Sequence, residues 1–316
     1  MSNKIANRQA ICDTLIELAE TDKTIMVLCS DSRGSASMKP FADRYPDQFV
    51  ETGIAEQNIV GIAAGLASCG KKPIVASPAA FLSARAAEQV KVDVAYSHMN
   101  VVLLGISGGI SYGALGMSHH SLQDIALMRA IPGIDVILPC DQFESRNVIR
   151  DLMRNPRPAY VRIGRNAVAD VFSEEEQEYH AGKATKLHVG DDAAIIATGE
   201  TVRFALDAAL VLEQEGIQVQ VLDMHTLKPF DLEAVNEASK TGYIVTMEEH
   251  SVFGGLGAAV SQQVCKVNPC RVDCLAIPDE PAVAGEAKEV FAYYGISAQN
   301  VVKLIQERSI KIPQRG

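Results

Sequence analysis

The stretch FVETGIAEQNIVGIAAGLASCG at residues 49–70 carries the strongest structural signature in this sequence. A polar, turn-prone entry leads into a helix whose body consists almost entirely of small or apolar residues. Glycine inside a helix costs about 1 kcal/mol relative to alanine, so Gly61 and Gly65 indicate that another backbone packs closely against this helix. Its first turn contains a single acidic residue, Glu56.

Two interpretations of Glu56 follow from its position. A first-turn glutamate favours the helix dipole and can cap the helix N-terminus. A carboxylate at the N-terminus of a helix made of small, apolar residues can also belong to a site that keeps a proton on the acid, because a low-dielectric environment disfavours the charged form. Spacing alone leaves both interpretations open.

Short apolar runs alternate with amphipathic stretches on either side of this helix. Continuous Val/Ile/Leu runs are typical of buried parallel strands, and this alternation predicts an α/β fold with a parallel sheet covered by helices on both faces. The predicted strands are 24–31, 72–77, 100–107, 134–141 and 158–164, and the predicted helices are 4–20, 56–69, 83–97, 119–131 and 142–154.

A polar, acidic stretch at 166–192 interrupts the alternation, which then resumes to about residue 307. This polar stretch is typical of a linker and is predicted to lead into a short edge strand. The second alternating region is long enough for a smaller α/β domain. The predicted organisation is therefore a first domain at 1–167, a linker at 168–190 and a second domain at 191–316.

Composition excludes several classes of function. The 316 residues include 39 acidic and 29 basic residues, which gives a formal net charge of −10. A chain this acidic lacks the excess positive charge with which proteins bind nucleic acid or an anionic membrane surface. The sequence has no apolar run long enough for a membrane span and no apolar signal region at its start, so we expect a cytoplasmic protein.

The seven cysteines contain no CxxC pair and are expected to be reduced, buried thiols.

Several motifs together resemble the transketolase family of thiamine diphosphate enzymes. IAEQNIVGIAAGLA resembles the family's pyrimidine-binding domain, and the resemblance extends over nearly the whole chain. The motifs that carry it are KIANRQAI (4–11), LCSDSRGSAS (28–37), AAFLSARAAEQV (79–90), GALGMSHHSLQDIALMRAIPGIDVILPCD (113–141), RPAYVRIGR (157–165), LKPFD (227–231) and EEHSVFGGLGAAV (248–260). This implies the pyrimidine-binding fold followed by the family's smaller C-terminal domain.

One family motif is missing. A full transketolase chain has a preceding half whose GDG…N motif holds the metal and the cofactor diphosphate, and neither GDG nor another phosphate-binding fingerprint occurs here. The resemblance therefore implies the C-terminal half of a split transketolase. Its partner would be an N-terminal subunit that carries GDG…N and the ligands for Mg²⁺ or Ca²⁺, most simply in an α2β2 heterotetramer, and no metal site is expected on this chain.

The resemblance assigns cofactor contacts to three residues. The family equivalent of Glu56 bonds the aminopyrimidine ring nitrogen, and sharing a proton there favours the imino form, which can deprotonate the thiazolium carbon. Phe81 matches an aromatic residue that stacks on the pyrimidine, and its alternative is a core phenylalanine. Asp31 matches a position near the cofactor and the subunit interface.

Substrate contacts are implied for four further residues. His119 matches a histidine that hydrogen-bonds the donor sugar and shuttles protons, with a structural helix-start histidine as the alternative; His120 is expected behind it. Arg8, Ser35 and Arg165 match sugar-phosphate binders, and the planar fork of arginine suits a phosphate.

Two positions depart from the family pattern. Transketolases that act on common sugar phosphates recognise the hydroxyl groups of the donor with a histidine and an aspartate. The corresponding residues here are Ser107 and Leu115. A leucine cannot accept a hydroxyl hydrogen bond, so the departures indicate an unusual ketose or a differently arranged loop.

The sequence favours a transketolase subunit that transfers a two-carbon ketol unit between sugar phosphates. Three alternatives stay open at this point. The chain could be the beta subunit of a 2-oxo acid dehydrogenase, a relative of deoxyxylulose phosphate synthase, or a non-catalytic regulatory subunit with the same fold. The candidate phosphate binders favour transketolase over the dehydrogenase, and Glu56 argues against a non-catalytic role because an idle buried acid is costly.

Overall fold

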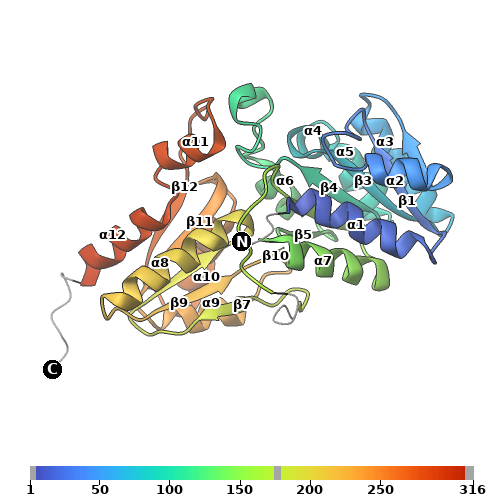
Figure 1. Cartoon of the computed structure of the whole chain (residues 1–316). Coiled ribbons are helices and arrows are strands. Elements are labelled where there is room, and N and C mark those ends of the chain that lie inside the picture. The colour runs from blue at the N-terminus through green and yellow to red at the C-terminus, as the bar shows by residue number, and fades with distance from the viewer. Residues whose placement is uncertain (1–4, 174–178, 310–316) are drawn as a thin grey trace.

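A computed structural model describes residues 5–173 and 179–309, which form two α/β halves (Figure 1). In the N-terminal half, apolar runs form mostly buried strands, and amphipathic stretches form the helices that cover them. Its elements are α1 (Asn7–Ala19), β1 (Ile25–Cys29), α2 (Lys39–Arg44), η1 (Pro46–Gln48), β2 (Phe49–Glu51), α3 (Glu56–Ser68), β3 (Lys72–Pro78), α4 (Ala79–Ala84), α5 (Ala87–Gln89), η2 (Val90–Tyr96), β4 (Val102–Ile106), η3 (Gly113–Ser118), α6 (Asp124–Ala130), β5 (Asp135–Ile137), α7 (Gln142–Arg154) and β6 (Ala159–Arg162).

The first sheet has the strand order β10-β5-β6-β4-β3-β1-β2. The pairs among β1 to β6 are parallel, so their carboxyl ends meet at one edge. Helices α1 and α7 cover one face, and α3, α4 and α6 cover the other (Figure 1). In open α/β sheets, ligands bind at the carboxyl ends of the strands, and that edge holds the candidate site.

The C-terminal half is a second α/β layer structure with the strand order β12-β11-β8-β9-β7, in which only the edge strand β7 runs antiparallel to its neighbour. Its elements are β7 (Thr185–His188), β8 (Ala193–Ala197), η4 (Gly199–Thr201), α8 (Val202–Gln214), β9 (Val219–Asp223), β10 (Thr226–Lys228), α9 (Leu232–Ser239), β11 (Tyr243–Ser251), α10 (Leu256–Val267), β12 (Arg271–Ile277), α11 (Ala287–Tyr293) and α12 (Ala298–Ser309). Together the two halves give the α/β class that the sequence predicts.

The two halves share a strand and a core. β10 leaves the second half and pairs antiparallel with β5 of the first sheet, with Thr226 opposite Ile137. The Leu138 N–H donates to the His225 carbonyl at 2.7 Å. One apolar cluster runs from α3 and α6 of the first half to α9 and α10 of the second. The halves are therefore joined by backbone hydrogen bonds as well as by packing.

Most predicted elements occur within a few residues of the expected bounds. The predicted helix 83–97 is instead divided into α4, α5 and the π-helical turn η2, and α2, β2 and β10 were not predicted. The expected linker 168–190 ends in β7, and its residues 174–178 lie outside the described residues.

Two general expectations can be compared with the described residues. None of the helices described here is long and apolar enough to cross a bilayer. All seven cysteines lie in the described part of the chain and are free thiols, but the expectation that all are buried is wrong. Cys69, Cys265 and Cys274 are exposed.

Candidate active site

Glu56 lies at the start of α3, just beyond the carboxyl end of β2, with 2% of its surface exposed. Its side chain does not cap the helix. Its Oε2 accepts a hydrogen bond from Arg85 Nη1 at 2.6 Å, in an ion pair whose arginine is 46% exposed. Within the described residues, this buried carboxylate is thus paired with a side chain that solvent can reach.

Phe81 and Arg85 lie side by side after β3, on α4 and at its C-cap. The Arg85 guanidinium lies over the Phe81 ring, 4.7 Å from its centroid. A planar cation therefore fills the space between the aromatic ring and the Glu56 carboxylate.

His119 extends the row of side chains that begins at Glu56. Its ring lies edge-on to Phe81 at 5.2 Å and to Tyr112 at 5.3 Å between centroids. The neighbouring Ser118 hydroxyl lies 3.0 Å from His119 Nδ1. Among the described residues Nε2 has no hydrogen-bond partner, which leaves that atom available to a ligand.

Arg165, just after β6, lies with its guanidinium 5.2 Å from the Tyr112 ring centroid. Arg8, in the first turn of α1, donates from Nη1 to the Ser35 carbonyl at 2.6 Å. Burial first and the neighbouring Arg165 second lower the pKa of Arg8. Within residues 5–173 and 179–309 neither guanidinium has a carboxylate within ion-pair distance, so the two arginines together favour an anion.

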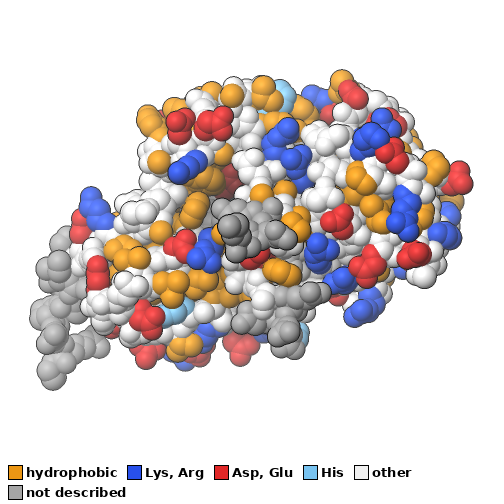
Figure 2. All heavy atoms as spheres, in the orientation of Figure 1, with side chains coloured by type: hydrophobic (Ala, Val, Ile, Leu, Met, Phe, Trp, Pro, Cys, Tyr) orange, Lys and Arg blue, Asp and Glu red, His pale blue; other side chains and the backbone are white. Residues whose placement is uncertain are grey.

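Successive contacts connect six side chains in one row along the carboxyl edge of the first sheet, in the order Glu56, Arg85, Phe81, His119, Tyr112 and Arg165. Arg8 extends this row beside Arg165, whose charge lowers the Arg8 pKa. Figure 2 shows basic side chains gathered at the top of the molecule between its two halves, on a face where acidic and basic groups are otherwise interspersed. One end of the row holds a buried acid, and the other end holds paired cations.

The other predicted positions lie around this row. Asp31 follows β1 at the same edge and is exposed, and its backbone N–H donates to Glu51 at 2.7 Å. Ser35 contributes its carbonyl to Arg8, while its hydroxyl donates to the Ser32 carbonyl. His120 is buried, with Nε2 2.9 Å from the Gly113 carbonyl, which fits a supporting position.

Ser107 and Leu115 occupy very different environments. Ser107 is fully buried with φ +54°, and its hydroxyl has no hydrogen-bond partner among the described residues. Leu115 is 53% exposed and lines a cavity of about 330 Å³ that also includes Arg165 and Tyr112. Leu115 can therefore meet a ligand beside the arginines, whereas Ser107 is enclosed by protein.

Sequence reasoning missed Arg85 and Tyr112. Arg85 stands inside the motif AAFLSARAAEQV, where its spacing from Phe81 places it one helical turn further on. Tyr112 follows a glycine-rich loop, and nothing in the local pattern distinguishes it from a surface tyrosine.

The expected close approach of another backbone at Gly61 and Gly65 does not occur among the described residues of this chain. A Cβ added at Gly65 would meet nothing within 4 Å, and one at Gly61 would meet only the Asp93 side chain, at 3.7 Å. The side of α3 that carries Gly61 and Gly65 is therefore open, whereas Ala63 and Ala64 are buried in the core.

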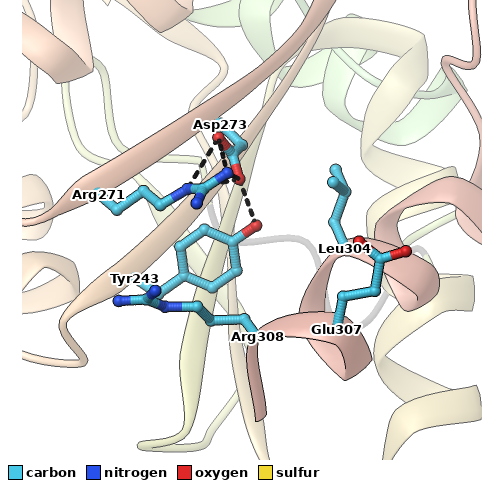
Figure 3. A pocket seen from close by; sticks show the side chains of 6 residues that line it. All are labelled: Tyr243, Arg271, Asp273, Leu304, Glu307 and Arg308. Carbon is cyan, nitrogen blue, oxygen red and sulfur yellow. Dashed lines mark hydrogen bonds and ion pairs between the residues drawn. The ribbon is translucent and has the colours of Figure 1, made fainter. Parts of the chain in front are cut away.

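Other features in the described residues favour a ligand less. A cavity of about 40 Å³ at the far end of the C-terminal half is lined by Arg271, Asp273 and Tyr243, whose polar groups bind one another (Figure 3). A larger, mostly apolar cavity of about 710 Å³ lies between residues 166–169, α8 and α11, and two of its charged wall residues, Arg203 and Asp207, pair with each other.

A fully buried group formed by Cys140, Glu144 and Asp223 lies where α7 meets β9. Burial raises the pKa of Glu144 to about 8 and the pKa of Asp223 well above its ordinary value. This is the behaviour of two acids that retain a proton between them. The group is accordingly interpreted as structural.

Two family models match successive parts of the chain. Residues 3–170 match the family model for the transketolase pyrimidine binding domain, and residues 182–301 match that for the transketolase C-terminal domain. A relative from Phocaeicola vulgatus, named as one of the subunits of an apulose-4-phosphate transketolase, is 50% identical over 97% of this chain and 98% of that protein.

Two other relatives and one solved structure have the same extent. A putative transketolase C-terminal section from Methanocaldococcus jannaschii is 38% identical over 96% of both chains. The 6-deoxy-6-sulfo-D-fructose transketolase subunit SqwH from a Clostridium species is 38% identical over 95% of this chain and 93% of that one. A solved structure described as a split gene transketolase, inactive β4 tetramer, has a TM-score of 0.87 at 37% identity and covers 96% of this chain and 98% of that chain.

Proposed function

Because this chain belongs to the transketolase family and has the extent of the C-terminal subunit of a two-chain transketolase, we propose that it supplies the pyrimidine-binding and substrate-phosphate side of an active site. A second chain completes that site. The main evidence for this proposal is the row of side chains from Glu56 to Arg8. The relatives do not favour a dehydrogenase beta subunit or a non-catalytic subunit.

The residues at the acidic end of the row fit thiamine diphosphate. Glu56 is a buried acid whose ion-pair partner Arg85 is half-exposed, and Phe81 offers an aromatic face. When bound, the cofactor supplies the carbon nucleophile that accepts a two-carbon ketol unit. Glu56 would hold a proton at the aminopyrimidine nitrogen, and Phe81 would contact the ring. Asp31, at the same edge, would face the second chain.

The residues at the basic end fit a phosphorylated sugar. Arg8 and Arg165 bind the terminal phosphate beside Ser35, and His119, in the middle of the row, exchanges protons with the reacting hydroxyls. Leu115 at the cavity wall supports a donor that differs from common ketose phosphates. Apulose 4-phosphate, named for the relative from Phocaeicola vulgatus, is the first donor to test.

The second chain is an N-terminal subunit with a GDG…N motif. It holds the cofactor diphosphate and Mg²⁺ or Ca²⁺, in a cytoplasmic α2β2 heterotetramer with sites at the interfaces. The nearly full overlap with relatives that are described as transketolase subunits supports this division. So does the description of the similar solved structure as an inactive tetramer of β chains.

Reconstitution tests the proposal. The isolated chain with thiamine diphosphate and Mg²⁺ should transfer no ketol unit, and adding the GDG…N chain should give activity on phosphorylated ketoses such as apulose 4-phosphate. The screen also includes 6-deoxy-6-sulfo-D-fructose, which carries a sulfonate in place of a phosphate. Full turnover by the isolated chain would contradict the division of labour. A reconstituted complex that decarboxylates 2-oxo acids but leaves ketose phosphates untouched would contradict the substrate class.

A further inference from the structure

The loop between β4 and α6 carries Tyr112, Leu115 and His119, and it is closed at its neck. Gly109 N–H donates to the Ser121 carbonyl at 3.1 Å, and Ser121 N–H donates back to Gly109 at 2.7 Å. The backbone hydrogen bonds of the tip among the described residues are local, between residues three or four apart, so the placement of the neck determines where His119 lies.

The C-terminal half reaches this neck through Glu249 of β11. Glu249 Oε1 accepts the Ile110 N–H at 2.7 Å, in a buried environment. Two residues further along the strand, the Ser251 N–H donates to the Leu122 carbonyl at 3.0 Å. Strand β11 therefore holds both ends of the loop.

A buried arginine fixes Glu249 in turn. Arg162 Nη2, at the end of β6, donates to the Glu249 carbonyl at 2.7 Å and lies 3.7 Å from its Oε2. Arg162 Nε also lies 3.4 Å from Asp124, the first residue of α6. One guanidinium thus connects the two halves and the helix that follows the loop.

The fit at the neck leaves no room for side chains. A Cβ added at Gly108 would collide with Arg162, and one at Gly109 would collide with both Glu249 and Arg162. Gly109 also has φ +61°, in the left-handed region that favours glycine. The Gly-Gly pair permits the close approach that lets Glu249 reach a backbone N–H.

The charges around Glu249 make its hydrogen bond sensitive to pH. Its carboxyl group faces Arg162, Asp124 and Glu200. Burial raises the pKa of Glu249 to about 7, while Arg162 and the Ile110 N–H act in the opposite direction. Hydrogen bonds to an ionised acceptor are about twice as strong as neutral ones, so the bond to Ile110 strengthens as pH rises through this value.

We infer that Glu249, from the C-terminal domain, is a positioning residue that sets the substrate-binding loop through the Ile110 N–H. The inference deepens the proposed function, and its catalytic readout rests on it, whereas its effect on the loop does not. It gives the C-terminal domain a direct part in placing Tyr112 and His119.

Hydrogen exchange of the full chain tests the contact independently of activity. Glu249→Ala should speed exchange in peptides covering 108–121 by about tenfold or more, since a hydrogen bond to a charged group is lost. Glu249→Gln, which keeps an acceptor oxygen, should show a smaller increase. Glu248→Gln is the matched control, because Glu248 instead accepts from Leu256 N–H and Gly257 N–H of α10. That variant should speed exchange at the start of α10 and leave the loop unchanged.

A pH series separates positioning from general stability, and it decides the matter if Glu249→Ala does not fold. The local opening that breaks the Ile110 bond leaves Glu249 buried, so only the strength of that bond changes with pH in this step. After correction for intrinsic exchange and for the global stability at each pH, protection of 108–121 in the wild type should therefore rise through about pH 7, and Glu249→Gln should remove that rise. Equal loop exchange in wild type and Glu249→Gln across the series would overturn the inference.

Kinetics of the reconstituted complex complete the test. Glu249→Gln should lower kcat more than it raises KM for the phosphorylated donor, because it displaces His119 and leaves Arg8 in place. If the wild-type complex transfers no ketol unit while the exchange results hold, the proposed function fails and the loop inference stands. If the complex is active and Glu249→Gln leaves both exchange and kcat unchanged, the loop inference fails alone.

Discussion

The Arg85 guanidinium donates to the Glu56 carboxylate at 2.6 Å and lies 4.7 Å from the centroid of the Phe81 ring. The guanidinium is planar, donates an N–H to the acid and covers the face of the Phe81 ring. The aminopyrimidine ring of the cofactor is proposed to make the same two contacts. Arg85 and the cofactor therefore compete for the same two side chains.

Removing Arg85 should relieve this competition. In the reconstituted complex, Arg85→Ala should tighten thiamine diphosphate binding by about three- to tenfold, the strength of a half-exposed ion pair plus a cation–π contact. Calorimetric titration measures it, with Lys91→Ala, an exposed cation on η2, as the control. Weaker binding by Arg85→Ala would instead show that the guanidinium holds the cofactor.

Replacing the buried acid tests its chemical role. Glu56→Gln keeps the shape of the side chain but cannot share a proton with the pyrimidine nitrogen, so exchange of the thiazolium proton in the assembled complex should slow by at least about 100-fold. NMR-detected deuterium exchange follows this proton directly, and Glu88→Gln, an exposed glutamate of α5, serves as the control. An unchanged exchange rate in Glu56→Gln would remove Glu56 from the activating role.

The paired arginines should act on the substrate and not on the cofactor. Arg8→Ala or Arg165→Ala should raise KM for a phosphorylated donor by a factor equivalent to a few kcal/mol, as expected for one lost charge-assisted contact, with little effect on an unphosphorylated analogue. His119→Ala should instead lower kcat. Steady-state kinetics on both donor types separates these effects, and equal losses on both would assign the arginines to the fold or to the subunit interface.

Donor preference should depend on Leu115 more than on Ser107. Because Ser107 is fully buried, a histidine there would not fit without rearrangement, whereas Leu115 is exposed at the cavity beside Arg165. Leu115→Asp should therefore shift preference towards common ketose phosphates, with a hydroxyl contact contributing about 1–3 kcal/mol. Ratios of kcat/KM for two donors measure it, with Leu115→Asn as the uncharged comparison. An unchanged ratio in both variants would show that the loop reads the donor elsewhere.

Stability should fall as pH rises from about 5 to about 8. Burial raises the pKa of Glu144 and Glu200 to about 8 and that of Glu249 to about 7, above their ordinary value of 4.5. The folded state then binds more protons than the unfolded state, so the free energy of unfolding decreases by about 1.4 kcal/mol per pH unit for each such group that titrates.

His225 opposes this trend below pH 6.5, because burial lowers its pKa to about 4. Urea denaturation at several pH values measures the slope, and Glu144→Gln should make it shallower. A stability that increases from pH 6.5 to 8 would contradict the assignment of retained protons.

The sequence predicted the parts of this molecule that depend on local pattern. Continuous apolar runs marked the strands, and a motif placed Glu56 at a helix start, because burial and helix entry leave a trace in neighbouring residues. Arg85 escaped prediction because its role depends on which way a partly exposed side chain points. Glu249 escaped because its contact with Ile110 joins positions 139 residues apart.

β10 was missed for a related physical reason. Its three residues are too few to show a strand period, and its partner β5 belongs to the other half of the chain. Pairing across such a separation is decided by tertiary packing and not by local propensity.

The pairing of β10 with β5 also limits how this chain can be cut into fragments and how its two halves can move. A fragment ending at the linker would leave β5 as an open sheet edge with unpaired N–H and C=O groups, a template for aggregation. Hinge bending between the halves would have to break the β5–β10 hydrogen bonds first. Recombination with other two-chain enzymes should therefore exchange this polypeptide whole, and mechanical pulling on its ends should unfold both halves in one cooperative event.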